Sequence, residues 1–239
     1  MIKTSTSRKL HRILGVIIGI QVLIWTISGA VFVWNDIETV RGDDSRTAPE
    51  PFSIQPDWIS PGAVDTQGRL DPERVTGIGL VRIGPEILYR LTDDDGAILL
   101  ADVRSGALRE PLSREEAVQL ARASFAIDAD VADAELLTSD RVGAHHEYRG
   151  GELPAWVVQF DHSSATRVYV SQRGGAVTRH RNQTWRVFDF FWMLHTMDYA
   201  GRDDFNHPLI KVISIAAITL TLSGYLLFSR TSSMRRRRR

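Results

Sequence analysis

Two long apolar runs lie near the ends of the chain, and each has the length needed to cross a membrane. The first extends from Ile13 to Trp34 and the second from Pro208 to Ser229. Each holds 22 residues, so an α-helix of either run reaches about 33 Å, more than the roughly 30 Å hydrocarbon core of a bilayer. The first run has no charged residue, and Lys211 in the second lies close enough to its end to reach the headgroups. The pattern predicts two transmembrane helices, over 13–34 and 206–229.

The segment between the apolar runs has a different pattern, with short alternating stretches and an amphipathic helix. Residues 35–59 are rich in Pro, Asp and Ser, which is typical of an irregular linker. Ser113 and Glu116 form a capping-box signature, and apolar positions recur after them at helical spacing as far as Phe125. Alternation then predicts strands over four ranges: 134–139, 144–148, 155–161 and 166–171.

An internal repeat divides this middle segment into two similar units. Residues 89–109 align without gaps on residues 158–178, at an offset of 69. The matched pairs include Leu91 with Phe160, Leu100 with Tyr169, and Gly106 with Gly175. A chance likeness between two generic hairpins is the alternative. The repeat predicts a first unit over 60–111 and a second over 112–183, each a helix packed on an antiparallel sheet. The expected fold is an α+β domain inserted between two transmembrane helices.

A further amphipathic helix and turn are expected over 184–205, directly before the second apolar run. Five side chains of this segment fall on one helical face: Phe188, Phe191, Trp192, His195 and Tyr199. An aromatic stripe beside a membrane-spanning helix is typical of a segment that lies in the membrane interface.

Charged residues are unevenly distributed, although the formal net charge is zero. All 29 acidic residues lie between Asp36 and Asp204, with 18 of the 29 basic residues, so this segment carries −11 and the flanks carry +11. Positive flanks stay in the cytoplasm, so residues 1–12 and 230–239 are expected there, with the acidic domain translocated to the opposite side of the membrane. A cleaved signal peptide is the alternative for the first run, but the run is too long and no small-residue cleavage motif follows. The basic tail then contacts anionic lipid rather than nucleic acid.

The absence of cysteine from the sequence limits its chemistry. Disulfides, thiolate metal sites, iron–sulfur clusters and covalently attached c-type haem are excluded. Any redox cofactor must therefore be held by His, Met or Tyr. The sequence also has no HExxH motif, phosphate-binding loop or dinucleotide-binding glycine motif, so hydrolase and nucleotide-binding functions lack support.

His11 and His195 are candidate ligands because each lies on a helical face beside the membrane. His11 is in line with Gly15 and Gly19, a small-residue face that suits either close helix packing or a flat macrocycle. His195 lies within the aromatic stripe, where a buried imidazole must be hydrogen-bonded or ligated. A carboxylate at Asp189 or Asp198 is placed to orient that ring.

The other histidines are less informative. His207 precedes Pro208 and is either a helix-start residue or a second axial ligand. His145 and His146 are adjacent on a predicted strand and so point to opposite faces, which makes a poor chelate. His162 and His180 are expected in solvated turn or strand-edge positions.

The order of these features resembles that of PepSY-associated transmembrane proteins. The residues that carry the resemblance are Arg8-Lys-Leu-His11 through Gly15, the helix from Leu112 to Phe125, the strands around Trp156 and Tyr169 with Gly174-Gly175, and Leu222-Ser-Gly224 after the Trp185–Pro208 segment. The resemblance covers most of the chain and implies a PepSY domain between the two membrane helices.

Larger relatives with four transmembrane helices include haem-binding inner-membrane reductases of ferric siderophores. The resemblance therefore implies non-covalent haem b and ferric reduction in iron uptake. This chain has half that number of helices, so the function requires a homodimer, whose four helices would enclose the cofactor. His11 would ligate a haem near the cytoplasmic side, with Gly15 and Gly19 giving it room, and His195 and His207 one near the outer side. Electrons would come from quinol or a partner protein, and the substrate would be ferric iron or a ferric siderophore. The alternative is a membrane-anchored PepSY regulator or scaffold without a cofactor.

Overall fold

The computed structural model describes the backbone of residues 4–236 and the side chains of residues 12–225 and Phe228. The chain divides into two compact units. The helical unit holds the residues up to Asp36 and from Val187 onward, and the sheet domain is Ile37–Arg186.

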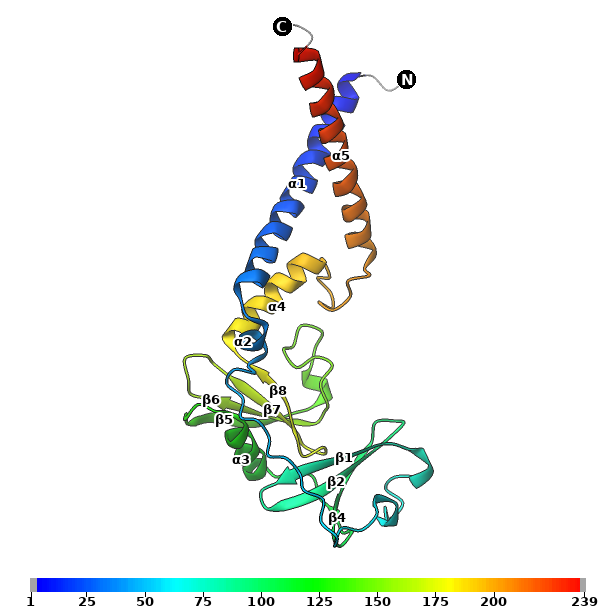
Figure 1. The fold of residues 1–239 in the computed structure, drawn as a ribbon, viewed down its shortest axis with the longest axis vertical. Coiled ribbons are helices and arrows are strands. Elements are labelled where there is room, and N and C mark those ends of the chain that lie inside the picture. The colour runs from blue at the N-terminus through cyan, green and yellow to red at the C-terminus, as the bar shows by residue number, and fades with distance from the viewer. Residues whose placement is uncertain (1–3, 237–239) are drawn as a thin grey trace. The chain divides into compact units, whose positions relative to one another are not determined.

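The helical unit is built on two long helices, α1 (Thr4–Trp34) and α5 (Pro208–Arg236), and on α4 (Gln183–Thr196), which begins in the sheet domain. Helices α1 and α5 are antiparallel and in contact, so α1 begins at the end of the pair where α5 finishes (Figure 1). Both are apolar enough to cross a membrane, over Arg12–Trp34 and Pro208–Tyr225. The two segments expected to span the membrane are therefore both helical.

The sheet domain contains two four-stranded antiparallel sheets, in each of which the strands follow one another in chain order. The first sheet holds β1 (Val75–Ile83), β2 (Glu86–Asp93), β3 (Ile98–Asp102) and β4 (Leu108–Arg109). The second holds β5 (Val131–Leu137), β6 (Ala155–Phe160), β7 (Arg167–Ser171) and β8 (Val177–Arg181). The α+β class expected from the sequence is confirmed.

Helix α3 (Arg114–Ser124) begins at the predicted capping box. Ser113 accepts the backbone N–H of Glu116, and the Glu116 carboxylate accepts the backbone N–H of Ser113. The buried positions Ala117 and Ala121 are both small, so the helix backbone can approach the sheet closely. The main core joins this helix to the second sheet and to one face of the first.

Two further cores cover the outer faces of the sheets. On the first sheet, Tyr89, Leu91 and Leu99 pack with Val64 and Leu70 from the segment before β1. On the second sheet, Val157 and Tyr169 pack with Tyr148 from the loop over 138–154. Side chains alternate between the two faces along each strand, so both sheets are apolar on both sides.

The predicted repeat is present in the strands. An offset of 69 residues places β3 on β7 and the positive-φ Gly106 on Gly175, and the pair Ala101–Leu108 on the pair Val170–Val177. The next pair differs, because a register shift in the second sheet places Tyr169 opposite Arg179. The gapless alignment is wrong for the preceding strand. Leu88 pairs with Asp102, whereas Ala155 pairs with Ser171, so β2 falls on β6 at an offset of 67. The second hairpin loop is two residues longer, and a loop length leaves no signature in the strands it joins.

Three local expectations are corrected by the structure. The first repeat has no α-helix: only 3-10 turns at Pro61–Ala63 and Pro72–Arg74 precede β1, because two prolines and Gly68 interrupt that segment. The strand expected at 144–148 is part of the irregular loop over 138–154. The linker over 35–59 contains a short helix, α2 (Ile37–Arg41).

Candidate functional site

His195 is in the last turn of α4, where it packs against α1. Its Nδ1 lies 2.7 Å from the Ser28 hydroxyl oxygen, and its backbone carbonyl accepts a hydrogen bond of 2.8 Å from the Trp25 indole N–H. Ser28 is fully buried. Burial lowers the pKa of His195 below its usual value, so the ring is neutral near pH 7.

Aromatic rings surround the His195 imidazole. The Phe32 ring lies 5.3 Å from it in an edge-on arrangement and 4.6 Å from Phe188, and the Trp25 ring lies 6.4 Å from the imidazole. Phe188 and Trp192 stack on each other, and both contact Phe32. Phe188, Trp192 and His195 therefore lie on one face of α4, as the predicted aromatic stripe required, and all three contact Phe32.

The stripe does not continue to Tyr199. Helix α4 ends at Thr196, and Met197 then adopts a φ of +59°. The backbone of Tyr199 therefore lies in the turn after the helix and not on its aromatic face.

Helix α1 satisfies the exposed backbone carbonyls at the end of α4. The last carbonyls of an α-helix have no partner within the helix. The Gln21 amide donates to the Leu194 carbonyl at 3.5 Å, and Trp25 donates to His195 as described above. Gln21, Trp25 and Ser28 recur every three to four residues, so they occupy one face of α1.

These three residues were missed in the sequence. The pattern drew attention to Gly15 and Gly19, which belong to a different face of α1. Gln21 and Ser28 are two of the few polar residues in the apolar run, with Thr26, and that is the signal that could have found them, because polar groups within a membrane helix usually face a partner.

The expectation that a carboxylate orients His195 is wrong. Asp189 forms an ion pair of 2.6 Å with Arg202. The Asp198 carboxylate accepts backbone N–H groups of Gly201, Asp204, Ala200 and Asp203, and the bonds from Gly201 and Asp204 contribute most to holding its pKa below the usual value. The orienting group is the Ser28 hydroxyl, which lies more than 160 residues away in sequence.

His207 stands at the start of α5, as its helix-start interpretation required. Its Nδ1 accepts the backbone N–H of Leu209 at 3.3 Å. Within the described part of the chain, His207 has no hydrogen bond or ring contact with His195. The side chain of His11 lies outside the described residues.

Gly15 and Gly19 border open space in the single chain. A Cβ atom built on either glycine meets no described atom within 4 Å. An added methyl group at either position is therefore compatible with the described part of the chain.

The remaining histidines belong to the sheet domain. His180 is buried, contrary to the expectation that it is solvated, and its Nε2 lies 3.1 Å from the Ser124 hydroxyl. His145 is exposed in the loop over 138–154, and His146 Nδ1 accepts the backbone N–H of Tyr148 there. His162 is half-buried, with Nδ1 2.8 Å from the Ser164 hydroxyl.

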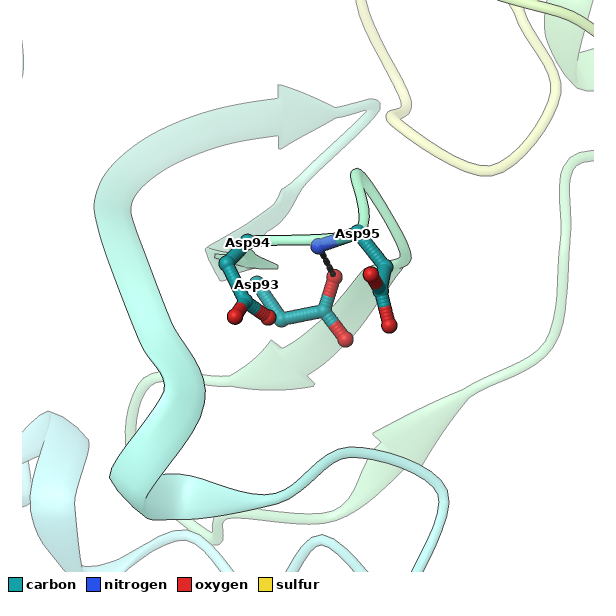
Figure 2. A group of neighbouring side chains, drawn as sticks. All are labelled: Asp93, Asp94 and Asp95. Atoms are coloured by element: carbon teal, nitrogen blue, oxygen red, sulfur yellow. Dashed lines mark hydrogen bonds between the residues drawn. The ribbon is translucent and has the colours of Figure 1, made fainter.

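Three consecutive aspartates in the turn between β2 and β3 bring their carboxylates together (Figure 2). The Asp93 carboxylate accepts the backbone N–H groups of Asp95 and Ala97, which shapes the turn. The Arg74 guanidinium contacts Asp94 at 2.7 Å and Asp95 at 2.6 Å. The cluster is thus explained by a turn and an ion pair.

The comparisons with known proteins agree with this architecture. The family model described as "PepSY-associated TM region" matches residues 3–231, which is nearly the whole chain. No curated protein and no solved structure matches the chain. The match includes both long helices and the sheet domain between them, and the chain therefore belongs to the PepSY-associated TM region family.

Proposed function

We propose that this protein is a haem-binding electron carrier of the bacterial inner membrane, acting as a homodimer that reduces ferric iron or a ferric siderophore. The observation that carries the proposal is the environment of His195. One nitrogen of its neutral ring is bound by Ser28, and within the described part of the chain the other nitrogen has no hydrogen-bond partner. Histidines that bind metals commonly have this arrangement, with one nitrogen held by the protein.

The residues around His195 fit a b-type haem. The imidazole lies beside the rings of Phe32 and Trp25, and Trp192 packs against Phe32, so the surroundings are aromatic and suit a flat apolar macrocycle. With no cysteine in the chain, attachment is non-covalent. Haem iron, when bound, supplies one-electron transfer. The polypeptide would hold the His195 imidazole in position and exclude water.

One chain presents one well-oriented imidazole, which supports a homodimer. The Nδ1 lone pair of His207 is engaged at the start of α5, so its other nitrogen carries the proton when the ring is neutral. His207, or a histidine of a second copy of the chain, would supply the other ligand to the iron. His11 would serve a separate haem towards the cytoplasm, beside Gly15 and Gly19.

The proposed orientation rests on charge. Helices α1 and α5 are antiparallel, so the start of α1 and the end of α5 would lie on the same side of the bilayer. The positive charges at both ends of the chain favour the cytoplasm for these helix ends, which would leave the sheet domain in the periplasm. The electron donor would be quinol or a partner protein. The net charge of −11 in the middle segment would attract cationic iron but repel an anionic ferric chelate, so charge does not choose between the two substrates.

The identity of residue 195 tests the proposal directly. We expect His195→Ala and His195→Gln each to remove or shift one haem signal in the Soret region, because an amide replaces a hydrogen bond but is a poor iron ligand. The purified full chain in detergent is examined by absorption spectroscopy, with His145→Gln, an exposed loop substitution, as the control. A His195→Gln protein with an unaltered Soret band would contradict ligation, and colourless wild-type protein would favour a cofactor-free regulator or scaffold.

The dimer is tested at Gly15. We expect Gly15→Leu to weaken self-association and haem retention together, because an added Cβ meets no described atom of the chain within 4 Å, and a bulky side chain there would hold a second copy of the helix away. Val16→Leu, an exposed position one residue along α1, is the matched control. Sedimentation and haem content are measured on the same detergent samples. A monomeric protein that is fully loaded with haem would separate the two properties and refute the dimer requirement.

A further inference from the structure

The Ser28 hydroxyl has one hydrogen and several neighbours that compete for it. Its oxygen lies 2.8 Å from the Ile24 carbonyl, 3.1 Å from the Trp25 carbonyl and 2.7 Å from His195 Nδ1. Carbonyl oxygens only accept hydrogen bonds, whereas an imidazole nitrogen either donates or accepts. The direction of the bond between Ser28 and His195 therefore depends on where the hydroxyl hydrogen goes.

Counting hydrogen bonds decides the direction. If Ser28 donates to the helix carbonyls, its oxygen is free to accept the Nδ1–H of His195, and two hydrogen bonds form. If Ser28 donates to Nδ1, the contact with the carbonyls provides no hydrogen bond and only one forms. A buried hydrogen bond contributes about 1 kcal/mol. Ser28 is fully buried, so water does not compensate for the loss.

The proton position on one nitrogen determines the other in a neutral imidazole. A ring that donates from Nδ1 has its lone pair on Nε2. Nε2 has no hydrogen-bond partner within the described part of the chain, so it is the nitrogen available to a metal.

We propose that Ser28 is a positioning residue that fixes the Nδ1–H tautomer of His195 and makes Nε2 the iron-binding atom. The iron-binding part of this inference rests on the proposed function, and the tautomer does not. A hydrogen bond from Nδ1–H to Ser28 also makes the imidazole a more basic ligand, which stabilises ferric over ferrous haem. Helix α1 thus sets both the orientation and the basicity of a ligand carried by α4.

The tautomer is measured by nitrogen-15 NMR of histidine-labelled, haem-free full-length protein in lipid nanodiscs. The His195 signal is identified by its loss in His195→Gln. We expect the wild type to carry its proton on Nδ1, and Ser28→Ala to show a mixture of tautomers. Ser28→Thr should restore the wild-type pattern, because threonine keeps a hydroxyl bonded to the preceding helical turn.

Thr26→Val is the matched control. Thr26 is also a hydroxyl residue of α1 and donates to the Val22 carbonyl at 2.9 Å, but it is exposed and has no contact with His195 among the described residues. This variant should leave the His195 signal unchanged. A wild-type ring protonated on Nε2, or a Ser28→Ala ring still wholly protonated on Nδ1, would overturn the assignment of Ser28.

Haem-loaded protein provides the second readout. Ser28→Ala should shift the midpoint potential to a more positive value, because the ligand becomes less basic, while Thr26→Val should not. An unchanged potential in Ser28→Ala would overturn the role of Ser28 in tuning the ligand. Wild-type protein that takes up no haem would overturn the proposed function, while the tautomer assignment is judged separately on the haem-free signal.

Discussion

Replacing Gly175 with alanine is expected to destabilise the sheet domain by about 3 kcal/mol, through left-handed backbone strain of about 1 kcal/mol and core overpacking of about 2 kcal/mol. Gly175 has a φ of +64°, and an added Cβ would lie 2.8 Å from Ile83 Cδ1 and 3.0 Å from Leu100 Cδ1. Ile83 and Leu100 are buried in the main core and have little space to move. Gly175 is therefore the point where the turn of the second sheet meets the side chains of the first.

Substitutions at two other glycines separate the cost of backbone strain from the cost of core overpacking. Gly84 also has a positive φ, but an added Cβ meets no described atom within 4 Å, so Gly84→Ala should cost only about 1 kcal/mol of strain. At Gly106, the repeat equivalent of Gly175, the added Cβ would lie 2.9 Å from Ile59 Cδ1, and Ile59 is only half-buried and can shift. We expect the cost of Gly106→Ala to lie between the other two.

Hydrogen exchange measures this series on the full-length protein. The slowest amides of β2 and β7 report the stability of the sheet domain. A loss of 3 kcal/mol should speed their exchange roughly 100-fold in Gly175→Ala, and less than tenfold in Gly84→Ala. Equal effects at the two glycines would show that strain alone matters and that the packing of Gly175 against Ile83 does not.

Acidification is expected to destabilise the sheet domain through His180. Burial, and to a lesser extent the positive charge of Arg46, lower the pKa of His180 to about 4 from its ordinary 6.5, while Asp43 acts in the opposite direction. Below pH 6.5 the unfolded chain therefore binds a proton that the folded chain refuses, and stability falls as the pH falls from 6.5 to about 4. The full loss is about 3 kcal/mol, since one pKa unit corresponds to about 1.4 kcal/mol.

The structural cause of this sensitivity is the position of His180, which lies on β8 between the end of α3 and the segment around α2. Its Nε2 lies 3.1 Å from the Ser124 hydroxyl at the end of α3, and its buried Nδ1 has no hydrogen-bond partner among the residues that the structure describes. A Cβ added at Gly42 would lie 3.0 Å from its Cβ, so the segment around α2 closes over the ring. A charged imidazole there would have to break this packing to reach water.

The effect of His180 is isolated by a substitution. His180→Gln keeps a hydrogen-bond donor for Ser124 but does not titrate. Its sheet domain should lose less stability between pH 6.5 and 4 than the wild type, when amide exchange is measured across that range. His145→Gln, in the exposed loop, should behave as the wild type does. Identical pH profiles for wild type and His180→Gln would exclude His180 as the acid-sensitive group.

Much of the fold could be predicted because its signals are local. The capping box at Ser113 and Glu116 marked the start of α3 to the residue, since its hydrogen bonds span only three residues. The likeness of β3 to β7 was visible as an offset of 69. The misalignment of β2 with β6 depended on loop length, and the absent helix of the first repeat on how Val64 and Leu70 cover a sheet. Neither leaves a local pattern.

Only part of the candidate site could be predicted from the sequence. The helical spacing of Phe188, Trp192 and His195 located the aromatic face and its histidine. It did not reveal which residue holds the ring, and the nearby carboxylates at Asp189 and Asp198 were the wrong choice.

By itself, the sequence determined that the chain has two apolar helices, an α+β domain between them and a histidine on an aromatic helical face. These follow from apolar length, periodicity and capping, which act over a few residues. Only the tertiary structure decided that Ser28 on α1 faces His195 on α4, that Gly175 packs on Ile83 and that His180 is buried. Each of these depends on two segments distant in sequence meeting at one point, and side-chain packing selects that point only when the chain is folded.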